Sequence, residues 1–146
     1  MRRPVPSAGG LYPLEFYLLV RNVIGLPKGI YHYDAVGDGL EILSDGPWEQ
    51  QAEVAFPTWA FVKNAPVIFC IGADFARNQS KYGPRGYRYI LFEAGHVAQN
   101  KCLVAAEMQL ATLCMGGFND RVLNGLVGLD GLTEAIVYTV ALGQSG

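Results

Sequence analysis

Lys81 and Tyr82 stand side by side in a segment rich in cations and phenols, ADFARNQSKYGPRGYRY, at residues 73–89. A positive charge beside a phenol stabilises the phenolate, so this pair has the chemistry of an acid–base group. The same segment carries three arginines, Arg77, Arg85 and Arg88. Adjacent side chains in a loop need not face the same site, so a solvent-exposed basic loop without a catalytic role remains the alternative.

Two glycine-paired loops are the second feature with binding chemistry. In the first, at residues 4–10, prolines fix φ before two glycines, and Ser7 adds a hydroxyl. The second contains the glycine pair 116–117. Bare backbone lets N–H groups approach a flat or anionic ligand, although an ordinary turn is the alternative at both places. Neither loop matches G-x-x-x-x-G-K-[ST] or G-x-G-x-x-G, which gives no support to nucleoside-triphosphate or Rossmann sites.

A long helix is predicted over residues 87–110, YRYILFEAGHVAQNKCLVAAEMQL, with apolar residues around most of its circumference. One stripe of this helix is polar and consists of Glu93, His96, Asn100 and Glu107. We expect a row of buried, hydrogen-bonded structural residues, with a catalytic role as the alternative. The Glu-x-x-His spacing imitates half of a di-iron site, but the other ligands are missing, so no metal site is expected.

The remaining elements predict an α+β chain with a single domain over residues 1–146. A helix is expected to begin at Pro47, with Asp45 upstream as a possible cap. Continuous apolar runs indicate strands covered on both faces at 66–73 and 135–143. Further strands are predicted at 16–20 and, as a hairpin, within 29–43.

Composition narrows the class of protein. The 146 residues are 51% hydrophobic and carry a formal net charge of −2, which supports a substantial core and argues against a broad nucleic-acid or anionic-lipid binder. No apolar run approaches the roughly 20 residues of a membrane span, and the start of the chain lacks a signal-peptide core, so a cytoplasmic location is expected. The three cysteines lie in apolar surroundings and are expected to be buried free thiols: Cys70, Cys102 and Cys114.

Several segments occur together in an order that is typical of one family. They are PSAGGLYPLEFYLLV, KGIYHYD, ADFARNQSKYGPRGYRYILFEAGHVAQN, GGFND and a closing ALG. Over nearly its whole length the chain resembles the FMN-dependent nitroreductase superfamily and, more narrowly, its SagB-type, azoline-oxidising branch. The resemblance implies a nitroreductase-like α+β sandwich, with a central mixed or antiparallel sheet packed by the long helix. It also implies a homodimer with FMN at the subunit interface.

The resemblance further implies roles for individual residues. Those implied to lie at the flavin are Arg3, Pro6, Ser7, Ala8, Gly9, Gly116 and Gly117. Residues 6–9 would line the isoalloxazine ring, and the later glycine pair would bring N–H groups to its reactive edge. Lys81 and Tyr82 match the Lys-Tyr pair of azoline dehydrogenases, with Tyr82 as the base. The implied reaction is the two-electron oxidation of a thiazoline or oxazoline in a modified peptide.

The chain also departs from the family pattern. It starts directly before the flavin loop, so we expect it to lack the amino-terminal segment that helps relatives hold the FMN phosphate. Two alternatives therefore stay open. One is a generic nitroreductase or flavin reductase that uses a nicotinamide donor. The other is a shortened, catalytically silent dimeric module that serves in binding.

Overall fold

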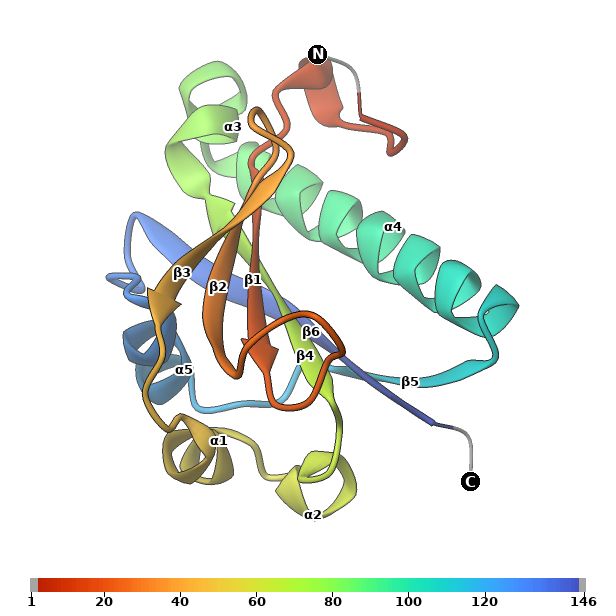
Figure 1. The fold of residues 1–146 in the computed structure, drawn as a ribbon. Helices are drawn as coiled ribbons and strands as arrows, with labels where there is room; N and C mark the ends of the chain where they lie inside the picture. Colours follow the sequence, from red (N-terminus) through yellow and green to blue (C-terminus); the bar gives the residue numbers. More distant parts are fainter. Residues whose placement is uncertain (1–2, 145–146) are drawn as a thin grey trace.

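Six strands form one antiparallel sheet in the order β3-β2-β1-β4-β6-β5 (Figure 1). The computed structural model describes residues 3–144. The strands are β1 (Leu14–Val20), β2 (Gly29–Asp34), β3 (Gly39–Ser44), β4 (Val67–Asp74), β5 (Leu110–Met115) and β6 (Glu134–Gln144). The predicted α+β class is confirmed, and the sheet is antiparallel throughout the described residues. The two runs expected to be covered strands, β4 and β6, lie inside the sheet, as predicted.

Five helices cover the sheet on two sides (Figure 1). They are α1 (Glu49–Ala55), α2 (Trp59–Val62), α3 (Phe75–Tyr82), α4 (Gly86–Glu107) and α5 (Asp120–Val127). Two short 3₁₀ turns, η1 (Ala8–Gly10) and η2 (Gly83–Arg85), precede β1 and α4. The predicted long helix is confirmed with slightly different ends, because it begins directly after η2 and stops before β5.

Strand alternation divides the core between the two faces of the sheet. In β1, Tyr17 and Leu19 pack with Trp48, beside α1 and α5, whereas Leu14 packs beneath α4. Successive side chains of a strand point to opposite faces, so one strand supplies both cores. As a result, α4 packs across one face of the sheet, and α3 directly precedes it in the chain.

Three sequence expectations need correction. Residues 75–82 form a helix and not a loop, because the Asp74 side chain accepts a hydrogen bond from the Arg77 N–H and caps the helix start. The helix expected at Pro47 begins at Glu49, after Trp48 and without a side-chain cap. The cysteines are not all buried. Cys102 is half-buried and Cys114 exposed, and their Sγ atoms lie 3.5 Å apart between α4 and β5.

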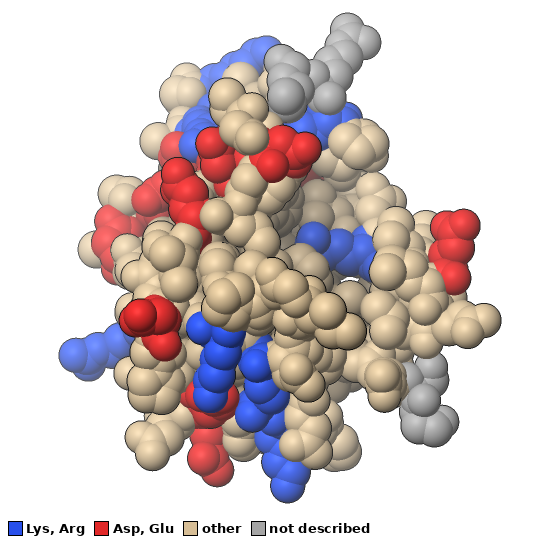
Figure 2. Space-filling view, in the orientation of Figure 1, with Lys and Arg blue, Asp and Glu red and all other residues tan. Residues whose placement is uncertain are grey.

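Figure 2 shows acidic and basic side chains interspersed on the face seen in Figure 1. In the described residues, no helix combines the length and the apolar character that crossing a membrane requires. The expected lack of a nucleic-acid partner and the cytoplasmic location stay predictions.

Candidate active site

The segment that precedes β1 closes on itself as a tight turn. The Tyr12 N–H donates to Ser7 Oγ at 2.9 Å, and the Gly10 N–H donates to the Ser7 carbonyl at 3.0 Å. Gly9 and Gly10 have φ values of 63° and 65°, which residues with a Cβ rarely adopt. The glycines therefore permit the turn, and the Ser7 hydroxyl holds it closed.

Lys81 and Tyr82 reach this turn from the end of α3. A Cβ placed on Gly9 would lie 2.6 Å from Tyr82 Oη and 2.8 Å from Lys81 Nζ. Lys81 Nζ is 5.3 Å from the centroid of the Tyr82 ring, and Tyr89 packs edge-to-face against that ring with centroids 5.0 Å apart. The structure thus brings Gly9, Lys81 and Tyr82 together, with the phenol supported by α4.

The start of α3 is fixed by a set of charged contacts. The Arg77 guanidinium lies 3.0 Å from an Asp74 carboxylate oxygen and 2.7 Å from a Glu15 carboxylate oxygen, and it donates to the Tyr12 carbonyl at 3.2 Å. Arg77 therefore joins α3, β1 and the turn, and its charge is already paired. Lys81 has no carboxylate partner among the described residues.

The other residues expected at the ring lie on or before the turn. Arg3 donates from Nη1 to the Leu14 carbonyl at 2.9 Å, and its guanidinium carbon is 5.4 Å from the Tyr12 ring centroid. Pro6 is exposed and Ala8 half-buried. The Arg3 guanidinium is thus held at the strand start, beside the loop it was expected to flank.

Glu93 is a buried carboxyl group on α4, and Ser7 of the turn influences its pKa. Its side chain is 2% exposed, and neither carboxylate oxygen has a hydrogen-bond partner among the described residues. Burial raises the pKa of Glu93, and the neighbouring Ser7, Arg3 and His96 oppose that rise in part. The prediction of a buried row of four was wrong, because the other three members are exposed: His96, Asn100 and Glu107.

The raised pKa of Glu93 predicts a pH-dependent stability. A carboxyl group that binds its proton more tightly when folded destabilises the fold as pH rises from the ordinary pKa of 4.5 through the raised value. We expect the free energy of unfolding to fall over this window, and Glu93→Gln to remove that part of the slope. Urea unfolding at a series of pH values measures it. Glu107→Gln, on the exposed side of α4, is the control and should leave the slope unchanged.

The second glycine pair does not join this cluster within one chain. Gly116 and Gly117 are exposed after β5, where a Cβ on Gly116 would meet the Tyr138 ring at 3.8 Å and a Cβ on Gly117 would meet nothing within 4 Å. Figure 1 shows the connection from β5 to α5 well away from the turn at η1. The roles expected for both glycines stay predictions.

Residues 2–144 match the family model described as "Nitroreductase family". The chain belongs to the nitroreductase family. The family expected from the sequence is thereby confirmed, and with it the general class of oxidoreductases.

Curated relatives agree with this assignment. The Methanocaldococcus jannaschii protein MJ1384, whose name places it provisionally among nitroreductases, is 36% identical over 125 residues, covering 86% of this chain and 63% of that protein. The microcin B17-processing protein McbC of Escherichia coli is 32% identical, covering 92% and 52%. The trifolitoxin-processing protein TfxB of Rhizobium leguminosarum is 29% identical, covering 92% and 38%. These last two accord with the SagB-type branch. The chain thus spans about half the length of these relatives.

Solved structures share the nitroreductase fold. The E. coli microcin synthetase McbBCD complex, with truncated pro-MccB17 bound, aligns with a TM-score of 0.84 at 25% identity, covering all of this chain and 57% of that one. A nitroreductase-type protein of Anabaena variabilis gives 0.83 at 29% identity, covering 94% and 28%. A Desulfovibrio desulfuricans family member in complex with FMN gives 0.66 at 17% identity, covering 98% and 67%, and shows the fold alone.

Proposed function

We propose that this protein is an FMN-dependent oxidoreductase that oxidises azoline rings in a modified peptide. The approach of Lys81 and Tyr82 to the bare backbone of Gly9 is the observation that carries the proposal. It sets an acid–base pair beside a strip of backbone that a flat ring can approach closely. The names of McbC and TfxB, which process peptide products, support a peptide substrate over a simple nitroaromatic.

The residues present fit a flavin in shape and charge. Gly9 has no side chain of its own in the turn at residues 6–9, and the ends of Tyr82 and Lys81 lie against its Cβ side, with Lys81 as an unpaired cation. Arg3 adds a second cation at the start of the loop. When bound, FMN would accept a hydride from the azoline and pass the electrons to dioxygen or another acceptor.

The chain's own residues would handle the proton. Aromatisation of an azoline removes one hydride and one proton, and Tyr82 Oη is the base that we assign to the proton. Lys81 Nζ, close to the same ring, would stabilise the phenolate. Tyr89 and the turn limit where the phenol can move, which keeps Oη at one place.

A homodimer would complete the site. The glycine pair 116–117 lies apart from the turn within one chain, whereas the resemblance expects both at one flavin. The side of α4 that faces away from the sheet exposes large apolar side chains, including Leu91, Phe92 and Leu103. An apolar helix face of this kind is typical of a subunit interface. We propose that two α4 helices meet across it.

The test measures flavin, dimer and turnover on the same purified protein. We expect uptake of about one FMN per chain, a dimer by sedimentation, and oxidation of a thiazoline-containing peptide with consumption of dioxygen. Protein that stays colourless after incubation with FMN would favour the silent binding module. Flavin-loaded protein that reduces a nitroaromatic with a nicotinamide donor, but leaves the thiazoline unchanged, would identify a generic nitroreductase.

A further inference from the structure

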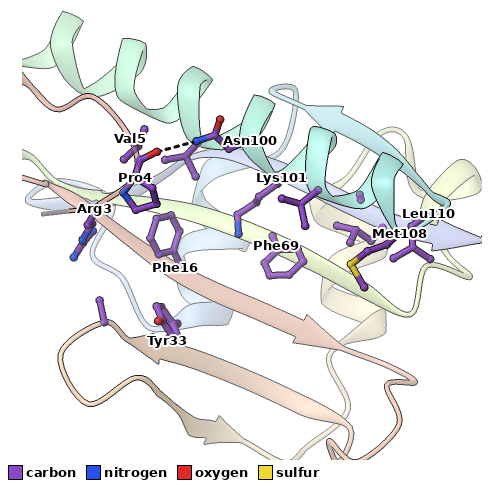
Figure 3. Close-up of a pocket in the computed structure, with 15 residues that line it drawn as sticks. Arg3, Pro4, Val5, Phe16, Tyr33, Phe69, Asn100, Lys101, Met108 and Leu110 are labelled. Atoms are coloured by element: carbon purple, nitrogen blue, oxygen red, sulfur yellow. Dashed lines mark hydrogen bonds between the residues drawn. The ribbon is translucent and has the colours of Figure 1, made fainter.

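A cavity of about 650 Å³ lies between α4 and the sheet, and Pro4 and Val5 line it at one end (Figure 3). Its walls are mostly apolar, with Phe16 and Phe69 from the sheet and Met108 from the end of α4. Asn100 lies at its rim and donates to the Pro4 carbonyl at 3.3 Å, which ties α4 to the start of the chain. The volume suits a small organic ligand.

Lys101 places a cation inside this apolar cavity. Its Nζ lies 4.0 Å from the centroid of the Phe69 ring and 5.2 Å from that of Phe16 (Figure 3). No described carboxylate lies within ion-pair distance of Nζ. Burial lowers the pKa of Lys101, which reflects the cost of a charge left without an anionic partner.

The charges around the cavity all have one sign. Arg3 also lines it, and no aspartate or glutamate among residues 3–144 does. Figure 2 shows a basic side chain within a hollow of largely uncharged surface. An aromatic ring stabilises a lysine ammonium group less than an anion does. A ligand with a single negative charge would therefore supply the partner that Lys101 lacks. The apolar walls of the cavity exclude a ligand that is charged throughout.

We propose that this cavity binds an apolar monocarboxylate of medium chain length. The carboxylate would pair with Lys101 Nζ, and the alkyl chain would lie along Phe69 toward Met108 and Leu110. In Figure 3, Phe69, Met108 and Leu110 follow one another on the same side of Lys101. Arg3 lines this cavity and is also proposed to lie at the flavin, but Lys101, which would pair with the carboxylate, has no role in the proposed oxidoreductase activity. Decanoate binding can therefore be tested separately from that activity.

The proposal is tested with decanoate as the ligand, and the NMR signals of the methionine methyl groups report where it binds. Met108 lines the cavity, whereas Met115 is buried in the core beside α1 and α5. In protein labelled with ¹³C at the methionine methyls, we expect decanoate to shift the Met108 signal saturably and to leave Met115 in place. Decanol, which has the same chain without the charge, should bind at least about tenfold more weakly.

Lys101→Met tests the role of the charge, because methionine keeps an unbranched apolar side chain in the cavity and removes the unpaired cation. The variant should fold, and decanoate affinity should drop at least about tenfold toward that of decanol. Lys63→Met, at an exposed lysine outside the cavity, is the control and should bind decanoate as the parent does. Equal affinity of the parent and Lys101→Met for decanoate would overturn the proposal. So would a Met108 shift that follows protein concentration instead of decanoate, because a second copy would then cover the cavity.

Discussion

Tyr82→Phe is expected to lower the rate of azoline oxidation by a factor of about 10² to 10³ while the bound FMN stays the same. The substitution removes only the phenolic oxygen, which is the atom that lies against Gly9. The ring itself remains packed on Tyr89, so the turn and the end of α3 keep their positions. Flavin absorbance and single-turnover oxidation of a thiazoline peptide, measured on the same sample, separate binding from chemistry.

Two further variants show whether the loss belongs to the pair. Lys81→Met should also slow turnover, because the phenol of Tyr82 loses its neighbouring cation. Tyr87→Phe removes the hydroxyl of an exposed tyrosine on α4 and should leave turnover unchanged. Full activity in both Tyr82→Phe and Lys81→Met would contradict their catalytic assignment.

Gly9→Ala is expected to weaken FMN binding by at least about a hundredfold. The added methyl group would lie 2.6 Å from Tyr82 Oη and 2.8 Å from Lys81 Nζ, so the ends of both side chains must move away from the turn. The φ of 63° adds strain of about 1–2 kcal/mol for any residue with a Cβ. Titration of the flavin-free protein with FMN measures the affinity.

Gly10→Ala is a matched control for this variant. Gly10 has nearly the same φ, 65°, but a Cβ there would meet nothing within 4 Å. The two variants share the backbone strain and differ in the crowding, so the gap between their FMN affinities reports the close approach of Lys81 and Tyr82. If Gly10→Ala lost as much FMN affinity as Gly9→Ala, backbone strain in the turn would explain both losses. The close contact of Lys81 and Tyr82 with Gly9 would then have no effect on FMN binding.

Local sequence patterns predict the helices and strands of this fold better than they predict the contacts between those elements. The long apolar run of α4 and the covered strands β4 and β6 are visible as periodicity and continuity. The helix α3 was not predicted because its sequence is largely polar and is followed by a glycine, which is also typical of a loop. Its stability comes from the Asp74 cap and from the Arg77–Glu15 ion pair, which joins residues 62 positions apart.

The site was predicted only in part for a similar reason. The resemblance implies roles for Gly9, Lys81 and Tyr82, and these roles stay predictions. Their proximity depends on how α3 returns to the turn before β1, which no spacing rule predicts. The polar stripe of α4 has regular spacing, yet Glu93 alone is buried, since the helix presents only part of that stripe to the core. Lys101 gives no sequence signal either. A lysine in an apolar helix is usually solvated, and here Lys101 is half-buried with its Nζ over the Phe69 ring.

The length of α3 is itself a part of the site. The Asp74 cap and the Arg77 contacts fix where this helix begins, and the proposed catalytic pair, Lys81 and Tyr82, occupies its last turn. Each residue added to or removed from the helix would rotate its end by about 100° and move it by about 1.5 Å. An insertion in α3 would therefore turn Lys81 and Tyr82 away from Gly9, although every side chain of the site would still be present. The position of this pair thus depends on the number of residues in α3.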